Sequence, residues 1–164
     1  MKIHLRESEP NDFPFLREML YEAVFWRANP NKPSFEEGLS YPDVKKALAG
    51  LGERDGDAAV VATIDSVSVG AAWYRFWTDS NPIRGYVDKE IPVLAIAVHR
   101  DYRHRGIGKK MIDWLIEHAS KQNIQRIGLC VSKDNYALNL YKQQGFHTYE
   151  DIGDSLIMVR SLID

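Results

Sequence analysis

The pattern of apolar and polar positions divides the chain of 164 residues into short elements of two kinds. Short apolar or alternating runs are typical of strands, whereas apolar residues three or four positions apart indicate helices. The first pattern predicts strands over residues 2–6, 57–64, 67–77, 93–98 and 126–131, and a strand from residue 146 that pairs with a last one over 155–161. The second predicts helices after residue 10, over 42–49, over 109–122 and from 135 to 144. The order of these elements predicts a mixed α/β sheet with helices on both faces.

Two of the helices carry apolar stripes that predict which residues pack against the sheet. In the first helix the expected core residues are Phe13, Leu16, Leu20 and Val24. Around the longer helix they are Ile107, Met111, Leu115 and Ala119, with Ile112 and Ile116 widening the stripe. Residues 27–40 hold two prolines and few apolar residues, and therefore predict a loop. Gly145 is placed to end the last helix in the left-handed conformation.

Length and charge narrow the classes of protein to which the chain can belong. A length of 164 residues predicts a single domain over residues 1–164. The 21 basic and 23 acidic residues are well mixed and give a net charge of −2, which argues against nucleic acid or an anionic membrane as the main partner. The start has no signal-peptide pattern, and no apolar run approaches the ~18 residues of a membrane span, so a cytoplasmic location is expected.

The cysteine and the histidines indicate neither a catalytic thiol nor a metal site. The single cysteine, Cys130, lies in an apolar run, where a thiol most often packs as a small hydrophobic group. The five histidines lack the spacing and the accompanying ligands of a metal site. We therefore expect no bound metal.

A basic turn with two glycines joins the strand at 93–98 to the following helix. Residues 103–108 read Arg-His-Arg-Gly-Ile-Gly, so guanidinium groups and residues without side chains stand where the helix begins. Unpaired N–H groups and the helix dipole favour an anion at such a place, which suits the pyrophosphate of a cofactor. Glycines also occur simply where a strand turns tightly into a helix, with the cations in solvent. The turn alone leaves both interpretations open.

A second motif downstream favours the cofactor interpretation. Residues 135–146 have the form Asn-x-Ala-x-x-x-Tyr-x-x-x-Gly-Phe, and residues 103–108 have the form Arg-x-x-Gly-x-Gly. Together the two motifs resemble those of the GCN5-related N-acetyltransferase (GNAT) family, and the resemblance is specific over residues 92–151. A Rossmann dinucleotide-binding fold fits less well, because the glycine turn follows a strand in the middle of the chain and lacks Gly-x-Gly-x-x-Gly.

The resemblance implies a fold and a cosubstrate. The implied fold is a central, mostly antiparallel twisted sheet of six to seven strands with helices on both faces. The implied cosubstrate is acetyl-coenzyme A, whose pantetheine arm pairs with the exposed backbone of the strand that ends at Val98. The N–H of Val98 then faces the acetyl carbonyl, and the turn holds the pyrophosphate. The implied cofactor-binding residues are Ile96, Ala97, Val98, Arg103, His104, Arg105, Gly106, Ile107, Gly108, Lys109, Asn135, Ala137 and Tyr141.

The same resemblance gives Tyr141 the role of protonating the departing coenzyme A thiolate, which a phenol with a pKa of about 10 can do at neutral pH. The alternative role for Tyr141 is aromatic packing beneath the sheet, and for Asn135 it is the start of a helix. Many relatives carry a carboxylate base within the strand at 93–98, but this chain has none there. We therefore expect a water molecule relayed to Asp88, Glu90 or His99. Arg100 stands where relatives often have proline.

Aromatic residues in the N-terminal half predict an acceptor pocket, with Trp26, Trp73 and Tyr74 as the expected contacts. The alternative is that alternate aromatic residues face the core. Together with Asp79, Asp88 and Glu90 near the acceptor side, the aromatic residues favour a small cationic amine.

Two other functions remain open alongside acetylation of a small amine. One is a peptide or protein acetyltransferase acting on lysine or an N-terminus, and the other is a coenzyme A-binding module without turnover. Because relatives are often dimers, a homodimer is possible on the same ground.

Overall fold

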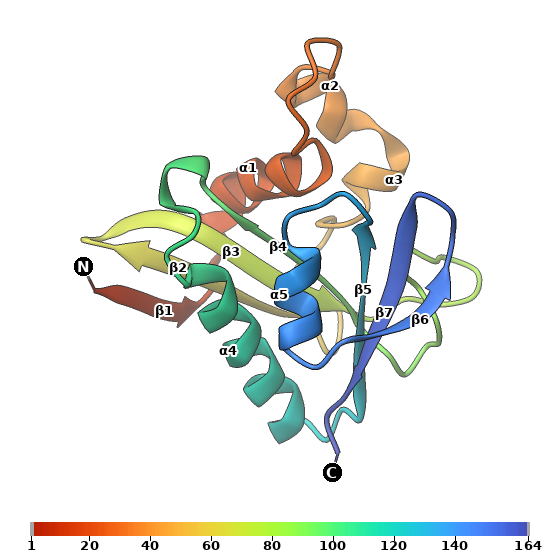
Figure 1. Cartoon of the computed structure of the whole chain (residues 1–164). Helices are drawn as coiled ribbons and strands as arrows, with labels where there is room; N and C mark the ends of the chain where they lie inside the picture. Colours follow the sequence, from red (N-terminus) through yellow and green to blue (C-terminus); the bar gives the residue numbers. More distant parts are fainter. Residues whose placement is uncertain (1, 164) are drawn as a thin grey trace.

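The computed structural model describes residues 2–163, and within them the chain forms one seven-stranded sheet in the order β1-β2-β3-β4-β5-β7-β6 (Figure 1). The strands are β1 (Ile3–Glu7), β2 (Ala58–Ile64), β3 (Val67–Arg75), β4 (Val93–Val98), β5 (Arg126–Ser132), β6 (His147–Asp151) and β7 (Ser155–Ser161). The helices are α1 (Phe13–Val24), α2 (Phe35–Ser40), α3 (Pro42–Lys45), α4 (Ile107–Lys121) and α5 (Leu138–Gln143), with short 3-10 turns η1 (Pro10–Asp12) and η2 (Arg100–Tyr102). All neighbouring strands are antiparallel except β4 and β5, which are parallel.

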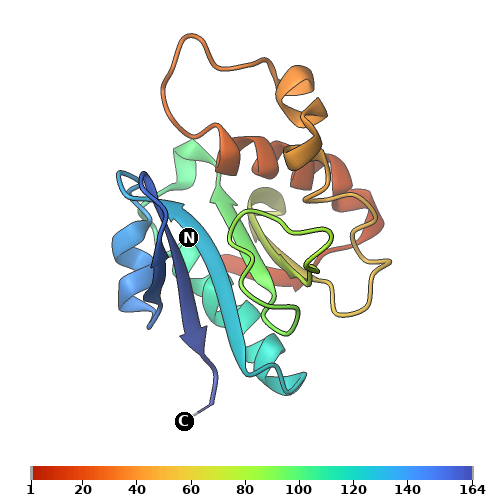
Figure 2. The ribbon, with the colours of Figure 1, turned by 90° about the vertical axis from the view of Figure 1, so that its right-hand side faces the viewer.

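Helices cover both faces of the sheet (Figures 1 and 2). Helix α1 packs on β3 and β4 from one side, and α4 packs on β1 to β4 from the other. Because successive side chains of a strand point to opposite faces, β4 contributes to two separate cores. Leu94, Ile96 and Val98 belong to the core beneath α4, whereas Ala95 and Ala97 belong to the core beneath α1. The predicted mixed, mostly antiparallel sheet with helices on both faces is confirmed.

The apolar stripe of α4 is confirmed, and that of α1 is partly wrong. Helix α1 buries Leu16, Met19 and Leu20, whereas Phe13 and Val24 are 39% and 41% exposed. Phe13 and Val24 are the first and last residues of the helix, where fewer neighbours cover a side chain. Met19 continues the three-or-four spacing of the buried face and was not included in the predicted stripe.

The predicted loop at 27–40 contains helix α2, which the sequence interpretation missed. The hydroxyl of Ser34 caps this helix by accepting a hydrogen bond from the N–H of Glu37 at 3.3 Å. A serine followed three residues later by glutamate is a known start signal for helices, so the sequence did contain a signal for α2. The helix predicted over 42–49 ends earlier, at Lys45.

Strands β4 and β5 are the feature of the sheet that positions the site. β4 pairs with β3 over its full length, but it pairs with β5 at one position only, Val93 with Gly128. There the N–H of Gly128 donates to the carbonyl of Pro92 at 2.9 Å. Beyond this point the two strands diverge (Figure 1). Their divergence leaves one backbone edge of β4 without a partner strand from Ile96 to Val98.

The long connection between β3 and β4 folds back over β5 (Figure 2). Gly85 packs directly against the backbone of β5 at Cys130. Among residues 2–163, no helix combines the length and apolar character that crossing a membrane requires.

Candidate active site

A cleft of about 980 Å³ lies in the gap between β4 and β5. Its walls come from the end of α1, from α3, from the end of β3 and the loop that follows, from the turn before α4, from α5 and from the start of β7. One end is the basic turn at 103–109, and the other lies beneath α3 and residues 82–84. These two ends are called the turn end and the acceptor end below.

The backbone of β4 presents alternate residues to the gap. The N–H of His99 donates to the carbonyl of Val69 on β3 at 2.8 Å, so the odd-numbered residues of β4 direct their backbone groups to β3. The even-numbered residues face the other way, as the bond from Gly128 to Pro92 also shows. The N–H groups of Ile96 and Val98 therefore point into the gap. Ala97 lines the cleft, but its backbone pairs with β3.

The turn before α4 has the geometry of an anion site. Gly106 adopts a φ of +82°, and α4 begins at Ile107 directly after it. The first helical bond runs from the N–H of Lys110 to the carbonyl of Gly106 at 3.2 Å. The N–H groups of residues 107–109 therefore precede any helical acceptor, as expected at a helix start. His104, Gly106, Gly108 and Lys109 also line the cleft, so these amides lie at its turn end.

Arg103 fastens this turn to β4 and to α1. Its Nε donates to the carbonyl of Val98 at 3.1 Å, and its Nη2 lies 3.5 Å from Glu22 on α1. Arg100 lies 3.8 Å from the same carboxylate. The guanidinium of Arg103 also covers the ring of Tyr136 at 5.2 Å. Arg103 thus serves as an anchor of the turn, while the guanidinium of Arg105 bonds the carbonyl of Asp101 at 3.2 Å.

Helix α5 places Tyr141 on the opposite wall of the cleft. Tyr141 is 7% exposed, its ring lies 6.0 Å from that of Phe146, and it lines the cleft. Burial raises the pKa of its phenol above the ordinary value, and the nearby phenol of Tyr136 adds to the effect. The hydroxyl is therefore protonated throughout the physiological pH range. Gly145 ends the helix with a φ of +88°, as predicted.

Asn135 organises the entry to α5. Its side-chain oxygen accepts a hydrogen bond from the N–H of Ala137 at 2.8 Å, and its carbonyl accepts one from Leu138 at 3.1 Å. Helix α5 itself begins at Leu138, later than the predicted start at residue 135, so Asn135 forms a turn ahead of the helix. Asn135 and Ala137 both line the cleft, so the side-chain amide nitrogen of Asn135 is left to bond a ligand there.

The structure separates the three predicted acceptor contacts. Trp26 and Trp73 line the cleft, and Trp73 is 2% exposed. Tyr74 does not line it, and the prediction for Tyr74 is wrong. As the neighbour of Trp73 on β3 it faces the other side of the sheet, where its hydroxyl bonds Nδ1 of His118 at 2.8 Å. Burial there raises the pKa of Tyr74 to about 12.

The structure also corrects the predicted bases, because Asp88 and Glu90 do not line the cleft. Both are exposed in the connection before β4, where the carboxylate of Asp88 accepts a hydrogen bond from the N–H of Glu90 at 2.8 Å. Asp79, from the same connection, bonds the hydroxyl of Tyr86. These residues precede β4 in the sequence, so they lie near the first residue of the strand and outside the gap.

Among the described residues, the carboxylates that line the cleft are Glu22, Asp43 and Asp154. None of them was predicted. They come from α1, α3 and the turn before β7, and no local sequence pattern marks them because tertiary structure alone brings them to the cleft.

Comparison with known proteins identifies the family. The model of the acetyltransferase (GNAT) family matches residues 15–146. The chain belongs to this family. An uncharacterized N-acetyltransferase of Methanocaldococcus jannaschii is 32% identical to this GNAT protein over 114 residues, which are 68% of this chain and 49% of that protein. The chain thus spans about half the length of that relative.

Solved structures of other acetyltransferases have the same fold. The PaiA N-acetyltransferase of Thermoplasma acidophilum, in complex with coenzyme A, has a TM-score of 0.71 at 18% identity and covers 98% of this chain and 99% of its own. YncA of Salmonella typhimurium, a putative acetyltransferase with acetyl-CoA bound, has a TM-score of 0.70 at 18% identity. The likeness covers 100% of this chain and 96% of the YncA chain. The ribosomal-protein-S18-alanine N-acetyltransferase of Escherichia coli has a TM-score of 0.68 at 20% identity, and the likeness covers 99% of this chain and 96% of the Escherichia coli chain. These likenesses extend the family's fold over nearly the whole chain.

Proposed function

We propose that this protein transfers the acetyl group of acetyl-coenzyme A to the primary amine of a small molecule, by direct attack while both substrates are bound. The divergence of β4 from β5 carries the proposal. It opens a backbone edge that faces a cleft, with a helix start at one end and a buried tyrosine on the opposite wall. The coenzyme A and acetyl-CoA bound to the PaiA and YncA proteins support the choice of cosubstrate.

The residues present fit acetyl-coenzyme A. The free N–H groups of residues 107–109 and the basic turn suit its pyrophosphate. The edge of β4 suits the amide groups of its pantetheine arm, which can pair with a strand edge as another strand does. The side-chain nitrogen of Asn135 contacts the arm from the α5 side. Acetyl-coenzyme A itself supplies an acetyl group activated as a thioester.

Acetyl transfer requires the protein to orient the two substrates, to donate hydrogen bonds to the oxyanion and to supply a proton. The N–H groups of Ile96 and Val98 are the donors available to the acetyl carbonyl. When the acceptor nitrogen bonds to the acetyl carbon, the carbon–sulfur bond breaks and the sulfur needs a proton. Tyr141 lines the cleft across from these donors and is protonated, so it gives that proton, and the proton lost by the amine later restores the phenol.

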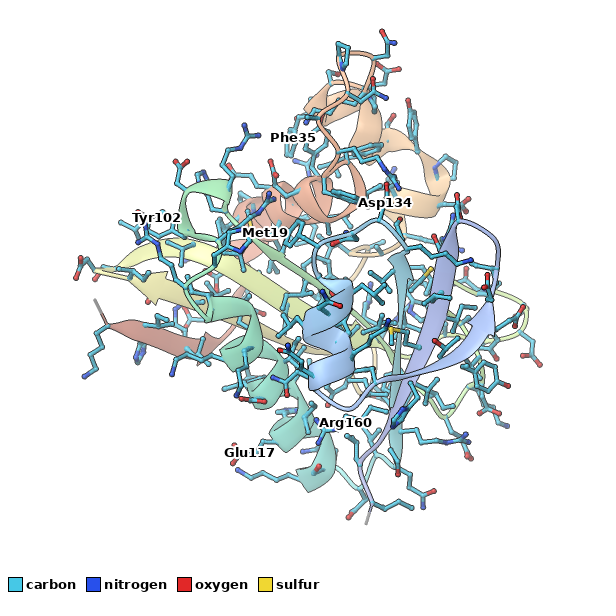
Figure 3. All side chains as sticks on the ribbon, in the orientation of Figure 1. Met19, Phe35, Tyr102, Glu117, Asp134 and Arg160 are labelled. Carbon is cyan, nitrogen blue, oxygen red and sulfur yellow. The ribbon has the colours of Figure 1, made fainter. Side chains whose placement is uncertain are left out.

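Two contacts across the cleft support a small acceptor. Arg27, after α1, holds Asp134, before α5, with a shortest distance of 2.7 Å (Asp134 is labelled in Figure 3). Lys46, directly after α3, donates to the carbonyl of Pro82. Each contact ties a residue that lines the cleft to another segment of the chain, and the two contacts narrow its opening, which favours a small acceptor over an extended peptide.

The test is a panel of amino acids, simple amines, polyamines, aminoglycosides and peptides, assayed for coenzyme A release and, by mass spectrometry, for the acetylated product. We expect a small amine to give both signals together, with initial rates that fit a ternary complex. Acetylation of peptides alone would replace the small acceptor with a peptide. Coenzyme A binding without release by any amine would leave a binding module.

A further inference from the structure

The acceptor end of the cleft is lined by three cations, Lys46, Arg75 and Arg84. Arg75 is 1% exposed and fully engaged. It makes two hydrogen bonds to Asp57 at 2.9 and 3.0 Å and further ones to the carbonyls of Ala47 and Ala49. Arg75 is therefore part of the scaffold, and Lys46 and Arg84 are the other cations at this end.

Two aromatic rings that line the cleft already hold cations of the protein itself. Arg54 lies 4.3 Å from the ring centre of Trp77, and Lys46 lies 5.8 Å from it. Arg27 lies 4.6 Å from the ring centre of Trp26. A cationic acceptor would have to displace these groups before it could use the rings. For Trp26 and Trp77, the expectation that aromatic faces hold a cationic amine therefore has no support in the geometry.

The carboxylates that line the cleft each have a cation nearby. Glu22 lies between Arg100 and Arg103 at the turn end. Asp43 has a side chain that is 99% exposed, and it lies 4.0 Å from Lys46. Asp154 pairs with Arg84 at 3.1 Å. Among the described residues, every carboxylate that lines the cleft thus lies within 4.0 Å of a cation.

Arg84 and Lys46 retain donors for an anion. Both oxygen contacts of Arg84 use the same nitrogen, Nη2, which bonds Asp154 at 3.1 Å and the hydroxyl of Ser155 at 3.0 Å. The pair with Asp154 is exposed, with side chains 62% and 80% accessible, so water and salt weaken it. The ammonium of Lys46 carries three protons, and one of them goes to the carbonyl of Pro82.

The position of Arg84 matches the place where the reaction is proposed. Gly85, the neighbour of Arg84, packs against Cys130 of β5, and Arg84 and Cys130 both line the cleft. Because Val93 pairs with Gly128 in parallel register, Cys130 stands level with Ala95, next to Ile96. Arg84 and the part of β4 whose N–H groups face the gap therefore line the same cleft.

We propose that the acceptor is an amine that also carries a carboxylate, and that Arg84 and Lys46 bind this carboxylate at the acceptor end. This inference rests on the proposed acetyltransferase function and names its substrate class.

The test compares amino acids with their matched amides and with the amines that lack the carboxylate altogether, using coenzyme A release. In the wild-type protein we expect kcat/KM for the preferred amino acid to exceed that of its amide by at least about tenfold, which is the usual size of a charged hydrogen bond. Arg84→Gln should remove this preference mainly through KM. It should leave the affinity for coenzyme A unchanged, and Lys46→Gln should act in the same direction.

Arg126→Gln is the matched control, because Arg126 is an exposed arginine on β5 that does not line the cleft. It should retain the full preference for the carboxylate. Equal or faster turnover of the amide in the wild-type protein would overturn the carboxylate site and leave the acetyltransferase standing. An unchanged preference in both Arg84→Gln and Lys46→Gln would overturn the assignment to these cations. Failure of every amine to release coenzyme A would overturn the proposed function and this inference with it.

Discussion

Replacement of Gly108 tests whether the start of α4 holds the pyrophosphate of coenzyme A. A Cβ at this position would lie 3.4 Å from Cδ2 of Leu140 and 3.8 Å from Cδ1 of Ile96, which are ordinary contacts with two residues that line the cleft. Gly108→Ala therefore fits the folded protein, and the better helix propensity of alanine adds up to ~1 kcal/mol of stability. Gly108→Asp has similar room and places a carboxylate at a helix start, where it is tolerated.

The two variants differ in charge at the proposed anion site. A carboxylate about 5 Å from a phosphate is repelled by about 1–3 kcal/mol at effective dielectric constants of ~80 to ~20, which weakens binding about 5- to 150-fold. We expect calorimetric titration with coenzyme A to show this loss for Gly108→Asp and a small effect for Gly108→Ala. Circular dichroism and thermal melts should show both variants folded. If Gly108→Asp binds coenzyme A as tightly as Gly108→Ala does, the pyrophosphate does not lie at this helix start.

Three further predictions concern catalysis and stability. Tyr141→Phe should lower kcat roughly 100-fold with little change in coenzyme A affinity, because only the proton donor is lost. Steady-state rates measure kcat and calorimetry measures the affinity. Wild-type turnover in this variant would mean that Tyr141 serves only in packing. Arg75→Met should destabilise the fold by about 3–5 kcal/mol in urea titrations, because it removes two charged hydrogen bonds from the buried carboxylate of Asp57 and leaves it the N–H of Gly52 and Arg54 at 4.0 Å; a loss below about 1 kcal/mol would contradict this. Arg6 lowers the pKa of Asp12 in the folded protein, so this pair contributes stability above the unfolded pKa of ~3.9 that is lost as the pH falls through the folded value. Asp12→Asn should flatten that acid limb of stability against pH, and an unchanged limb would contradict the assignment.

The elements that could be predicted from the sequence are those whose signals are local. Strand β4 has the predicted bounds because it is a short apolar run between polar segments. The buried face of α4 follows directly from its four-residue spacing. Gly106 and Gly145 both adopt positive φ, a conformation that favours glycine, so each marked a turn that the structure contains.

The parts of the site that escaped prediction depend on tertiary structure. Trp73 and Tyr74 are neighbours in sequence, and only the direction of β3 relative to α1 decides which of them meets the cleft. Arg27 and Asp134 are 107 positions apart, and nothing local pairs them. Lys46 and Arg84 likewise come from separate segments that meet above the gap.

Hydrogen exchange along β4 tests the central claim most directly. In the free protein, the N–H groups of Ala97 and His99 bond to β3, whereas those of Ile96 and Val98 face the open gap. If coenzyme A or acetyl-coenzyme A lies along this edge, its addition should slow exchange at Ile96 and Val98 and at residues 107–109, with little change at Ala97 and His99. Exchange at Ile96 and Val98 that stays as fast with saturating ligand as without it would contradict the account.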